Sequence, residues 1–341
     1  MRLATLLGAL VACSAVACSR TESSTGAIRT HALPATVNAE GAGRGAAPPS
    51  SRGLSAAAAP SAALATGERL PSEERTWTFA ATPVGPMSVV VLVPERANGA
   101  RLPVLIALHG RGEALKGPAR GARGWVDDYE LSARLRDLAE PPLASEDFKT
   151  FVTPQRLQQL NAALAERPYR GLVIVCPYTP DKLAGDDPLS KAEPLARFLV
   201  DELLPRVYRE TPALGTARAT GIDGVSLGGR AAWSVGLLRP EAFGAVAGLQ
   251  AAFDVKDAPG LAERARQAKQ RNPALSLRLL TSEHDYFLAA DSAIAAAVRA
   301  AGVAIHFSVA QGPHDYAFNQ GPGALEMLLF HDRTLRGEAP P

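Results

Sequence analysis

Seven short apolar runs recur along residues 77–335, and stretches with helical periodicity separate them. The runs cover residues 87–93, 103–108, 171–176, 219–225, 243–249, 275–280 and 304–309. Several are apolar at consecutive positions, which is typical of strands buried on both faces of a parallel sheet. Amphipathic helices are predicted at 154–166, 191–209, 229–238, 286–301 and 322–335. The alternation predicts one α/β domain with a mostly parallel sheet and helices on both faces.

One connection is much longer than the others. Residues 111–170 join two neighbouring apolar runs with far more chain than a crossover helix needs. Long connections of this kind often act as functional lids. The alternative is an additional pair of structural helices packed on the sheet, and the sequence leaves both interpretations open.

The first 18 residues have the pattern of an export signal. A positive start, a short apolar core and small residues precede Cys18, and the stretch is too short for a comfortable transmembrane helix. The segments ending at Cys13 and Cys18 both resemble the bacterial lipobox. We favour lipidation of Cys18 over Cys13, with cleavage without a lipid as the alternative. The serine that follows either cysteine resembles Gram-negative lipoproteins, which implies the outer membrane; without a lipid the protein is expected in the periplasm or outside the cell.

Residues 19–75 are rich in Ala, Gly, Ser and Pro and predict a disordered tether, so that the catalytic domain is expected at 76–341. Only one of the three cysteines, Cys176, falls in this domain. A disulfide framework and a cysteine zinc site are therefore excluded. The lipid is the only membrane contact expected, because no run of 18 apolar residues follows the N-terminus.

The charge balance gives no sign of a nucleic-acid partner. There are 36 Lys and Arg residues against 34 Asp and Glu, for a net charge of +2, and a nucleic-acid surface usually shows as a basic patch or stripe. The glycine-rich motifs that hold nucleotide phosphates are also missing. The composition thus favours a small-molecule substrate.

A G-x-S-x-G motif spans Gly224 to Gly228 and places Ser226 between a predicted strand and a predicted helix. In such a turn the serine adopts a strained conformation, and the glycines let neighbouring backbone pass close by. The context of strand, turn and helix predicts that Ser226 is a nucleophile.

A serine nucleophile needs a base and an acid that orients the base. His314 follows the strand at 304–309, and Asp285 follows the strand at 275–280, in the chain order serine, acid, histidine. Three other acids are alternatives for the role of Asp285: Glu283, Asp291 and Asp254. Asp285 could instead cap the helix that begins at Tyr286.

The remaining histidines fit the role of base less well. His31 falls in the predicted tether, His306 is expected to pack within a strand, and His331 is expected to face solvent on the last helix. His109 is expected to bond within its own loop.

Two backbone N–H groups are needed to stabilise the oxyanion of an acyl-transfer intermediate. Leu227 follows the nucleophile and should supply one of them. The loop after residue 108 should supply the other, from Arg111 or alternatively Gly112.

The segments "VLIALHGRGE", "GIDGVSLGGRAAWSVGLL" and "LLTSEHDYF…GPHDYAFN" resemble the putative esterase family of α/β hydrolases. That group includes esterase D-like, feruloyl and enterochelin esterases and mycolyltransferases. The resemblance covers about residues 100–335 and implies an α/β-hydrolase fold and ester hydrolysis. This sequence departs from the family's pattern in the residues on either side of Ser226 and in the enlarged 111–170 segment. Because of the enlarged segment, the family's substrate preferences do not carry over to this chain.

Four functions are compatible with these residues to different degrees. The favoured one is a secreted serine hydrolase that cleaves a carboxylic ester through an acyl-enzyme, with no cofactor and no metal. An acyltransferase or amidase could use the same triad, and a non-catalytic binding protein could reuse the fold. Three His-Asp dipeptides, at 284–285, 314–315 and 331–332, suggest a metal phosphohydrolase as a fourth function. They fall in three separate elements, whereas a metal site needs ligands that converge.

The predicted pocket walls carry several aromatic residues and arginines. Most of these aromatic residues are expected to pack in the core, and the alternative is that they line an apolar or sugar-binding cleft: Trp125, Tyr129, Tyr178, Tyr286 and Phe287. The arginines near the oxyanion loop are expected to be solvated: Arg111, Arg120 and Arg123.

Overall fold

The computed structural model describes residues 72–94, 99–181 and 191–341. The predicted signal peptide at 1–18, Cys13, Cys18, His31 and the tether up to residue 71 lie outside the described residues. Within the described part, no helix is long and apolar enough to cross a membrane.

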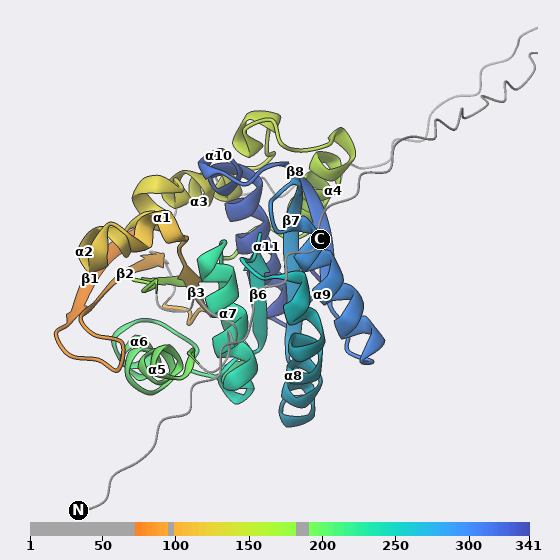
Figure 1. The fold of residues 1–341 in the computed structure, drawn as a ribbon. Coiled ribbons are helices and arrows are strands. Elements are labelled where there is room, and N and C mark those ends of the chain that lie inside the picture. Colours follow the sequence, from red (N-terminus) through yellow and green to blue (C-terminus); the bar gives the residue numbers. More distant parts are fainter. Residues whose placement is uncertain (1–71, 95–98, 182–190) are drawn as a thin grey trace, which may run out of the picture. The chain divides into compact units, whose positions relative to one another are not determined.

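An eight-stranded sheet forms the centre of the described domain, in the order β1-β2-β4-β3-β5-β6-β7-β8 (Figure 1). β2 pairs antiparallel with β1 and with β4, and the other neighbours are parallel. The predicted mostly parallel sheet is therefore confirmed. The strands are β1 (Ser72–Phe79), β2 (Met87–Pro94), β3 (Val104–Leu108), β4 (Val173–Pro177), β5 (Thr220–Gly224), β6 (Ala245–Leu249), β7 (Ser276–His284) and β8 (His306–Pro313).

Helices cover both faces of this sheet, and the central strands are therefore buried on both sides. Val104, Ile106 and Leu108 of β3 pack into one apolar cluster, while Leu105 and Ala107 pack into the other. The first cluster is closed by α5 (Glu193–Arg197), α6 (Leu204–Glu210), α7 (Leu227–Leu238), α8 (Ala258–Arg271) and α9 (Leu288–Ala300). The second is closed by α3 (Leu131–Ala139), α4 (Pro154–Glu166) and α11 (Ala324–Thr334).

The long 111–170 connection is a packed layer. It contains α1 (Arg111–Ala114) and α2 (Gly117–Gly121) as well as α3 and α4. Trp125, Phe148 and Leu160 are almost fully buried in the second cluster. Of the two interpretations left open by the sequence, the packed structural one describes this arrangement.

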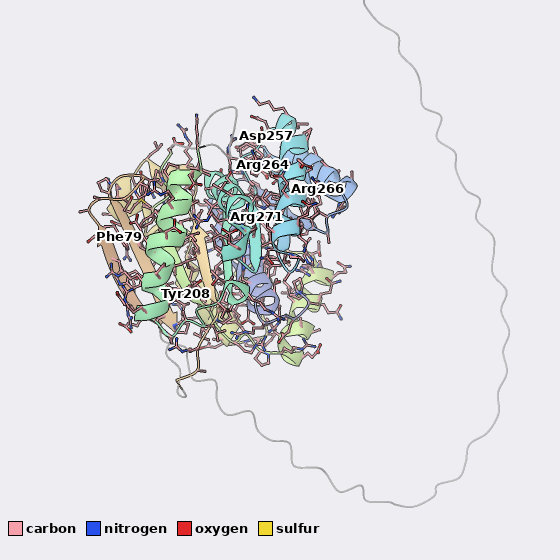
Figure 2. All side chains as sticks on the ribbon, turned by 90° about the horizontal axis from the view of Figure 1, so that it is seen from below. Phe79, Tyr208, Asp257, Arg264, Arg266 and Arg271 are labelled. Atoms are coloured by element: carbon pink, nitrogen blue, oxygen red, sulfur yellow. The ribbon has the colours of Figure 1, made fainter. Side chains whose placement is uncertain are left out.

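The elements that the sequence pattern does not predict include β1 and α8. β1 begins at Ser72, four residues before the predicted domain start, and pairs with β2 along its length. α8 buries mainly alanines and turns Glu263 and Arg264 outward. Figure 2 shows Arg264, Arg266 and Arg271 along this helix, seen from below.

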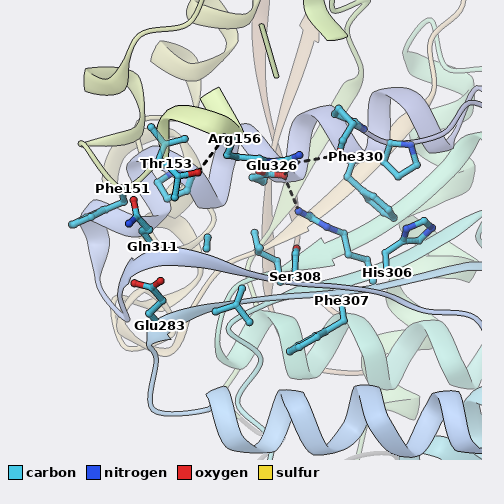
Figure 3. Close-up of a pocket in the computed structure, with 18 of the residues that line it drawn as sticks. Phe151, Thr153, Arg156, Glu283, His306, Phe307, Ser308, Gln311, Glu326 and Phe330 are labelled. Carbon is cyan, nitrogen blue, oxygen red and sulfur yellow. Dashed lines mark hydrogen bonds and ion pairs between the residues drawn. The ribbon is translucent and has the colours of Figure 1, made fainter. Parts of the chain in front are cut away.

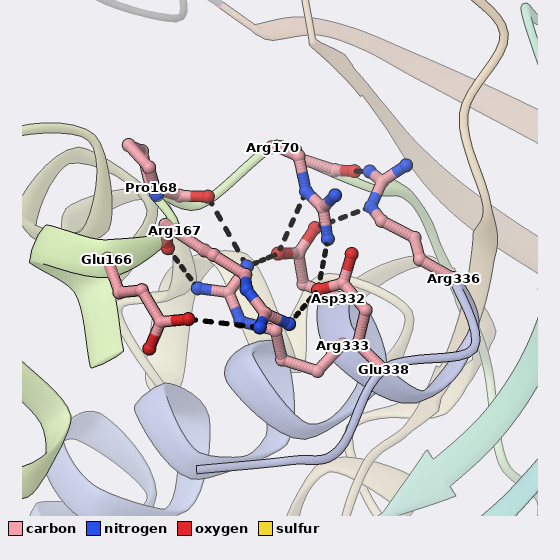
Figure 4. A network of polar contacts seen from close by, with 9 residues as sticks. Glu166, Arg167, Pro168, Arg170, Asp332, Arg333, Arg336 and Glu338 are labelled. Carbon is pink, nitrogen blue, oxygen red and sulfur yellow. Dashed lines mark hydrogen bonds and ion pairs between the residues drawn. The ribbon is translucent and has the colours of Figure 1, made fainter.

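A cluster of ion pairs fastens the end of the 111–170 segment to the end of α11 (Figure 4). Asp332 is buried and accepts from Arg333 Nη1 (2.9 Å) and Arg336 Nε (3.1 Å). Arg170 Nη2 pairs with Glu338 at 2.8 Å. These contacts fix the layer that contains α4 against the last helix.

Candidate active site

Ser226 lies on the turn between β5 and α7 with a positive φ (φ 56°, ψ −115°). Its N–H donates to Leu249 O (2.9 Å), and its carbonyl accepts from Ala252 N (3.0 Å). A Cβ on Gly224 would lie 2.5 Å from the backbone of Gly228, so the turn can close only with glycine there. A strained non-glycine backbone of this kind costs about 1–3 kcal/mol and is concentrated at functional sites.

His314 and Asp285 form a hydrogen-bonded pair at the ends of two neighbouring strands. His314 Nδ1 lies 2.7 Å from Asp285 Oδ1, and the exposed side-chain fractions are 17% and 0%. Asp285 also accepts from Thr281 Oγ1 (2.6 Å) and Phe287 N (3.0 Å). An acceptor-only carboxylate fixes Nδ1 as the protonated nitrogen, which leaves Nε2 free to act as a base.

The parallel strands bring Ser226 to the edge of the sheet where this pair lies. β5, β6 and β7 run side by side, and the loops after them are joined by Ser226 N to Leu249 O and Gln250 N to Leu280 O. No hydrogen bond from Ser226 Oγ to His314 is present among the described residues. Catalytic hydrogen bonds are often long without substrate and tighten in the complex.

The other candidate acids lie in different settings. Glu283 is exposed at the end of β7, and Asp254 caps a short helical turn. Asp291 is fully buried, and burial together with the charge of Asp285 raises its pKa well above the ordinary value. Its Oδ2 accepts from Ala251 N at 3.1 Å. Of the four acids, Asp285 is the one that contacts His314.

Two helix N-termini meet beside Ser226. Leu227 is the first residue of α7 and Arg111 the first of α1, so the N–H group of each has no acceptor within its helix. Val225 N donates to Leu108 O at 3.1 Å and holds the two turns together. Gly110 N donates to Tyr129 Oη at 3.2 Å. The backbone N–H groups of Leu227 and Arg111, and that of Gly112 after it, are therefore without an acceptor inside their own helices.

Glu113 is a buried carboxylate beneath this loop that the sequence analysis missed. It is 1% exposed and accepts from Tyr316 Oη at 2.6 Å and from Tyr129 Oη. Lys116 Nζ lies 3.7 Å from it. The hydrogen bond to Glu113 raises the pKa of Tyr316, and burial raises that of Tyr129. Since Tyr316 follows His314 by two residues, Glu113 connects the oxyanion loop to the histidine loop.

A second support for the histidine loop comes from Gln250. This buried residue has a positive φ (46°), and its Nε2 donates to Ser282 Oγ (2.7 Å) and Pro313 O (2.9 Å). Pro313 directly precedes His314. No pattern in the sequence marks Glu113 or Gln250, because each matters only through partners distant in the chain.

The other described histidines have three different environments. His109 is 1% exposed; its Nε2 accepts from Thr179 N (2.8 Å), and burial lowers its pKa to about 4. Its Nδ1 lies 2.9 Å from Gly110 O, so His109 bonds within its own loop as expected, and its bond with Thr179 reaches a second loop as well. His306 was predicted to be packed but is exposed, because β8 is an edge strand. His331 was predicted to face solvent and is instead fully buried, since α11 turns it toward Asp223.

The aromatic residues expected to pack divide into two groups. Trp125 and Tyr129 are buried, and Tyr178 is half-buried. Tyr286 is 81% exposed, with its ring centroid 5.3 Å from that of His314, and Phe287 lies at 5.4 Å from it. Tyr286 is therefore a rim residue of the site, which corrects the expectation that it packs.

The arginines near the oxyanion loop lie at the surface. Arg111 pairs with Asp181 (2.8 Å) with its side chain 67% exposed, and Arg123 pairs with Asp127. Arg120 is exposed. Within the described ranges, no group of three or more His, Cys, Asp or Glu side chains is placed to hold a metal ion.

Comparison with solved structures agrees on the architecture. A ferulic acid esterase matches with a TM-score of 0.55 at 17% identity, covering 78% of this chain and 99% of that one. An S-formylglutathione hydrolase from Staphylococcus aureus gives 0.55 at 11% identity, covering 77% and 100%. One from Agrobacterium tumefaciens gives 0.50 at 18% identity, covering 80% and 99%.

No protein-family model and no curated protein sequence matches the chain. The structural matches, with the strand order and the serine turn, nevertheless define the fold. This chain has the α/β-hydrolase fold, as the sequence predicted.

Proposed function

We propose that this protein is a serine hydrolase that cleaves a carboxylic ester. The observation that supports the proposal most is the His314–Asp285 pair at the sheet edge that also carries Ser226 on its strained turn. The structural neighbours, which include a protein named as a ferulic acid esterase and one named as an S-formylglutathione hydrolase, support the same class of reaction. The substrate is expected to be a small-molecule ester.

The proposed reaction has two halves, and in each of them His314 first takes a proton and then gives it up. Ser226 Oγ attacks the acyl carbon while His314 Nε2 takes the hydroxyl proton, and Asp285 stabilises the imidazolium. The N–H groups of Leu227 and of Arg111 or Gly112 stabilise the oxyanion. The C–O bond then breaks and the alcohol leaves with the proton from His314. Water attacks the acyl-enzyme with His314 as base, the acid leaves, and Ser226 regains its proton.

The test is labelling of the full chain with a fluorophosphonate probe, followed by mass spectrometry of the modified peptide. We expect one label on Ser226, lost in Ser226→Ala and in His314→Ala. Ser308→Ala, which removes an exposed serine from β8, is the matched control and should keep the label. Labelling of another serine, or full labelling of His314→Ala, would refute the triad.

The same triad could pass the acyl group to an alcohol or cleave an amide. Product analysis with added alcohol acceptors separates these reactions from hydrolysis: free acid alone supports the esterase, and a new ester identifies a transferase. A folded protein that takes no label supports a binding protein instead.

We further propose that the protein is exported and anchored by a lipid on Cys18, with Cys13 as the second choice. The proposal rests on the signal-like pattern of residues 1–18. Metabolic labelling with a palmitate analogue should be lost in Cys18→Ala and kept in Cys13→Ala. The opposite result would move the lipid to Cys13, and no label in either would leave a periplasmic or secreted protein.

A further inference from the structure

The two edge strands of the sheet differ in how far they are protected from pairing with another chain. β1 carries the charged residues Glu73, Glu74 and Arg75, and charges on an edge strand oppose the addition of a further strand. β8 carries no Lys, Arg, Asp or Glu, and its residues 306–311 contain no proline. The edge formed by β8 therefore lacks the features that usually keep an edge strand from pairing.

The outer side of β8 has no backbone partner among the described residues. Its inner neighbour is β7, and no backbone hydrogen bond joins residues 306–311 to any other described segment. A hollow of about 540 Å³ lies along the strand, lined by β8 and also by residues 151–153. Figure 3 shows His306 and Ser308 on one side of the strand and Phe307 on the other. The outward N–H and C=O groups of β8 are therefore available to another strand.

Two apolar side chains lie on one face of this edge. Side chains alternate along a strand, so Phe307 and Val309 point to the same face, on which Phe307 packs against the first apolar cluster. Val309 is 47% exposed. Burial of Val309 against an apolar group of another chain would favour association, because it removes apolar surface from water.

An acidic and a basic side chain lie near the two ends of this edge, and both are exposed. Glu283 lies near the end of β7, beside Gln311 of β8 (Figure 3). Arg299 belongs to α9, and its guanidinium lies 5.8 Å from the centre of the Phe307 ring. Neither Glu283 nor Arg299 forms an ion pair with another described residue. A surface with one acidic and one basic end is complementary to a copy of itself turned by half a turn.

We propose that β8 pairs antiparallel with β8 of a second copy of this chain, around a twofold axis at Val309. In an antiparallel pair, opposite residues lie on the same face of the sheet. Val309 therefore faces its own counterpart, and Phe307 faces Gln311 of the second copy. The same symmetry brings Arg299 of each copy beside Glu283 of the other. The two sheets continue as one, and the pairing does not depend on the proposed ester hydrolysis.

The first test is sedimentation equilibrium of the full chain at about 1–100 µM, which covers the dissociation constants of transient and stable dimers. We expect twice the mass of the chain. Val309→Lys sets two like charges opposite each other at the axis and should weaken the dimer by at least about tenfold. Thr76→Lys makes a matched change at an exposed position of β1 and should leave the dimer unchanged. Circular dichroism verifies that both variants are folded.

The second test exchanges the two charges. Glu283→Arg and Arg299→Glu should each weaken the dimer by about tenfold, because each sets like charges side by side twice in the symmetric interface. The variant that carries both substitutions should recover most of the loss, since opposite charges then face each other again. Both positions are exposed, so these variants serve if Val309→Lys does not fold.

The outcomes separate this interface from other contacts. A chain that stays monomeric over the whole concentration range would overturn the proposal. A dimer that survives Val309→Lys, or that Thr76→Lys weakens equally, would overturn it too, because the contact would then lie away from β8. A double charge variant that is weaker than both single variants would refute the pairing of Glu283 with Arg299 and with it the twofold axis at Val309.

Discussion

The domain contains two His–Asp pairs that differ mainly in their access to solvent. In the first, His314 Nδ1 lies 2.7 Å from Asp285 and its side chain is 17% exposed. In the second, His331 Nε2 lies 3.1 Å from Asp223 and both side chains are fully buried. The same two residue types thus form one pair with access to solvent and one pair that is fully enclosed.

The difference between the pairs lies in their surroundings. The first pair is at the carboxyl ends of β7 and β8, where the His314 side chain is 17% exposed and its hydrogen bond to Asp285 uses only Nδ1. The second is enclosed by α11 and β5, where His331 Nδ1 would be struck by any Cβ at Gly221 and has no hydrogen-bond partner within the described residues. A His–Asp pair alone therefore does not define a catalytic site, because access to the second nitrogen is also needed.

The strongest test of this comparison replaces Asp285 in the accessible pair with a residue of the same shape and no charge. Asp285→Asn should lower kcat/KM for an ester by about 10⁴-fold, because an amide can hold the imidazole in the wrong tautomer. The melting temperature should change little. Steady-state kinetics and a thermal melt measure the two effects.

The matched variant in the sealed pair is Asp223→Asn. It should change kcat/KM per folded molecule by less than about twofold, since the pair touches no substrate. If Asp223→Asn lowered the rate as much as Asp285→Asn, the division into a catalytic and a structural pair would be wrong.

Removal of the sealed histidine should instead affect stability. His331→Leu leaves the buried Asp223 carboxylate with one partner, Gly224 N at 2.7 Å, and should lower the free energy of unfolding by about 2–3 kcal/mol. Urea unfolding measures this loss. In Asp223→Ala/His331→Leu the loss should be smaller than the sum of the single variants, because no charge is left unpaired. Additive losses would show that the pair contributes no coupling.

How far the sequence could predict these features depends on whether the signal is local. Buried parallel strands and the G-x-S-x-G turn are encoded within a few residues, so the seven strands and the position of Ser226 were predicted correctly. β1 was missed because Ser72–Phe79 consists mostly of polar residues and Trp77 is its one buried side chain. α8 was missed because alanines form its buried face.

The candidate site shows the same limit. The pairing of His314 with Asp285 could be predicted because each follows a predicted strand, and parallel strands end at the same edge of a sheet. The burial of His331 was not predicted, because it depends on which face of α11 meets the sheet. Glu113 was missed because its partners Tyr129 and Tyr316 come from 16 and 203 residues away along the chain.

A second buried histidine, His109, tests whether an enclosed imidazole lowers stability in acid. Burial lowers the pKa of His109 from 6.5 to about 4, while the unfolded chain keeps about 6.5. Above the unfolded pKa both states are neutral and stability is full. As the pH falls from about 6.5 toward 4, the unfolded chain binds the proton first, so stability is lost, by about 2 kcal/mol at about pH 5.

The measurement for His109 is urea unfolding at about pH 7 and about pH 5, for the natural chain and for His109→Asn. The difference between the two pH values should be smaller in the variant, and other titrating groups cancel in the comparison. An equal difference in both proteins would mean that His109 is protonated in the fold.

The smallest expected effect concerns the link between the oxyanion loop and the open pair. Tyr316→Phe removes the 2.6 Å bond to Glu113 and should lower kcat by about tenfold with little change in KM, since a bond to a buried carboxylate is worth about 1.5–3 kcal/mol and only part of it acts on the transition state. Tyr286→Phe is the matched control, because Tyr286 also lies beside His314 but is 81% exposed; its kcat should stay within about twofold. If both variants behaved alike, the ring contact with His314 would matter and the Glu113 link would not. If Tyr316→Phe raised KM alone, Tyr316 would be a substrate contact, and the accessible pair would owe its orientation to Asp285 and Gln250 without help from the oxyanion loop.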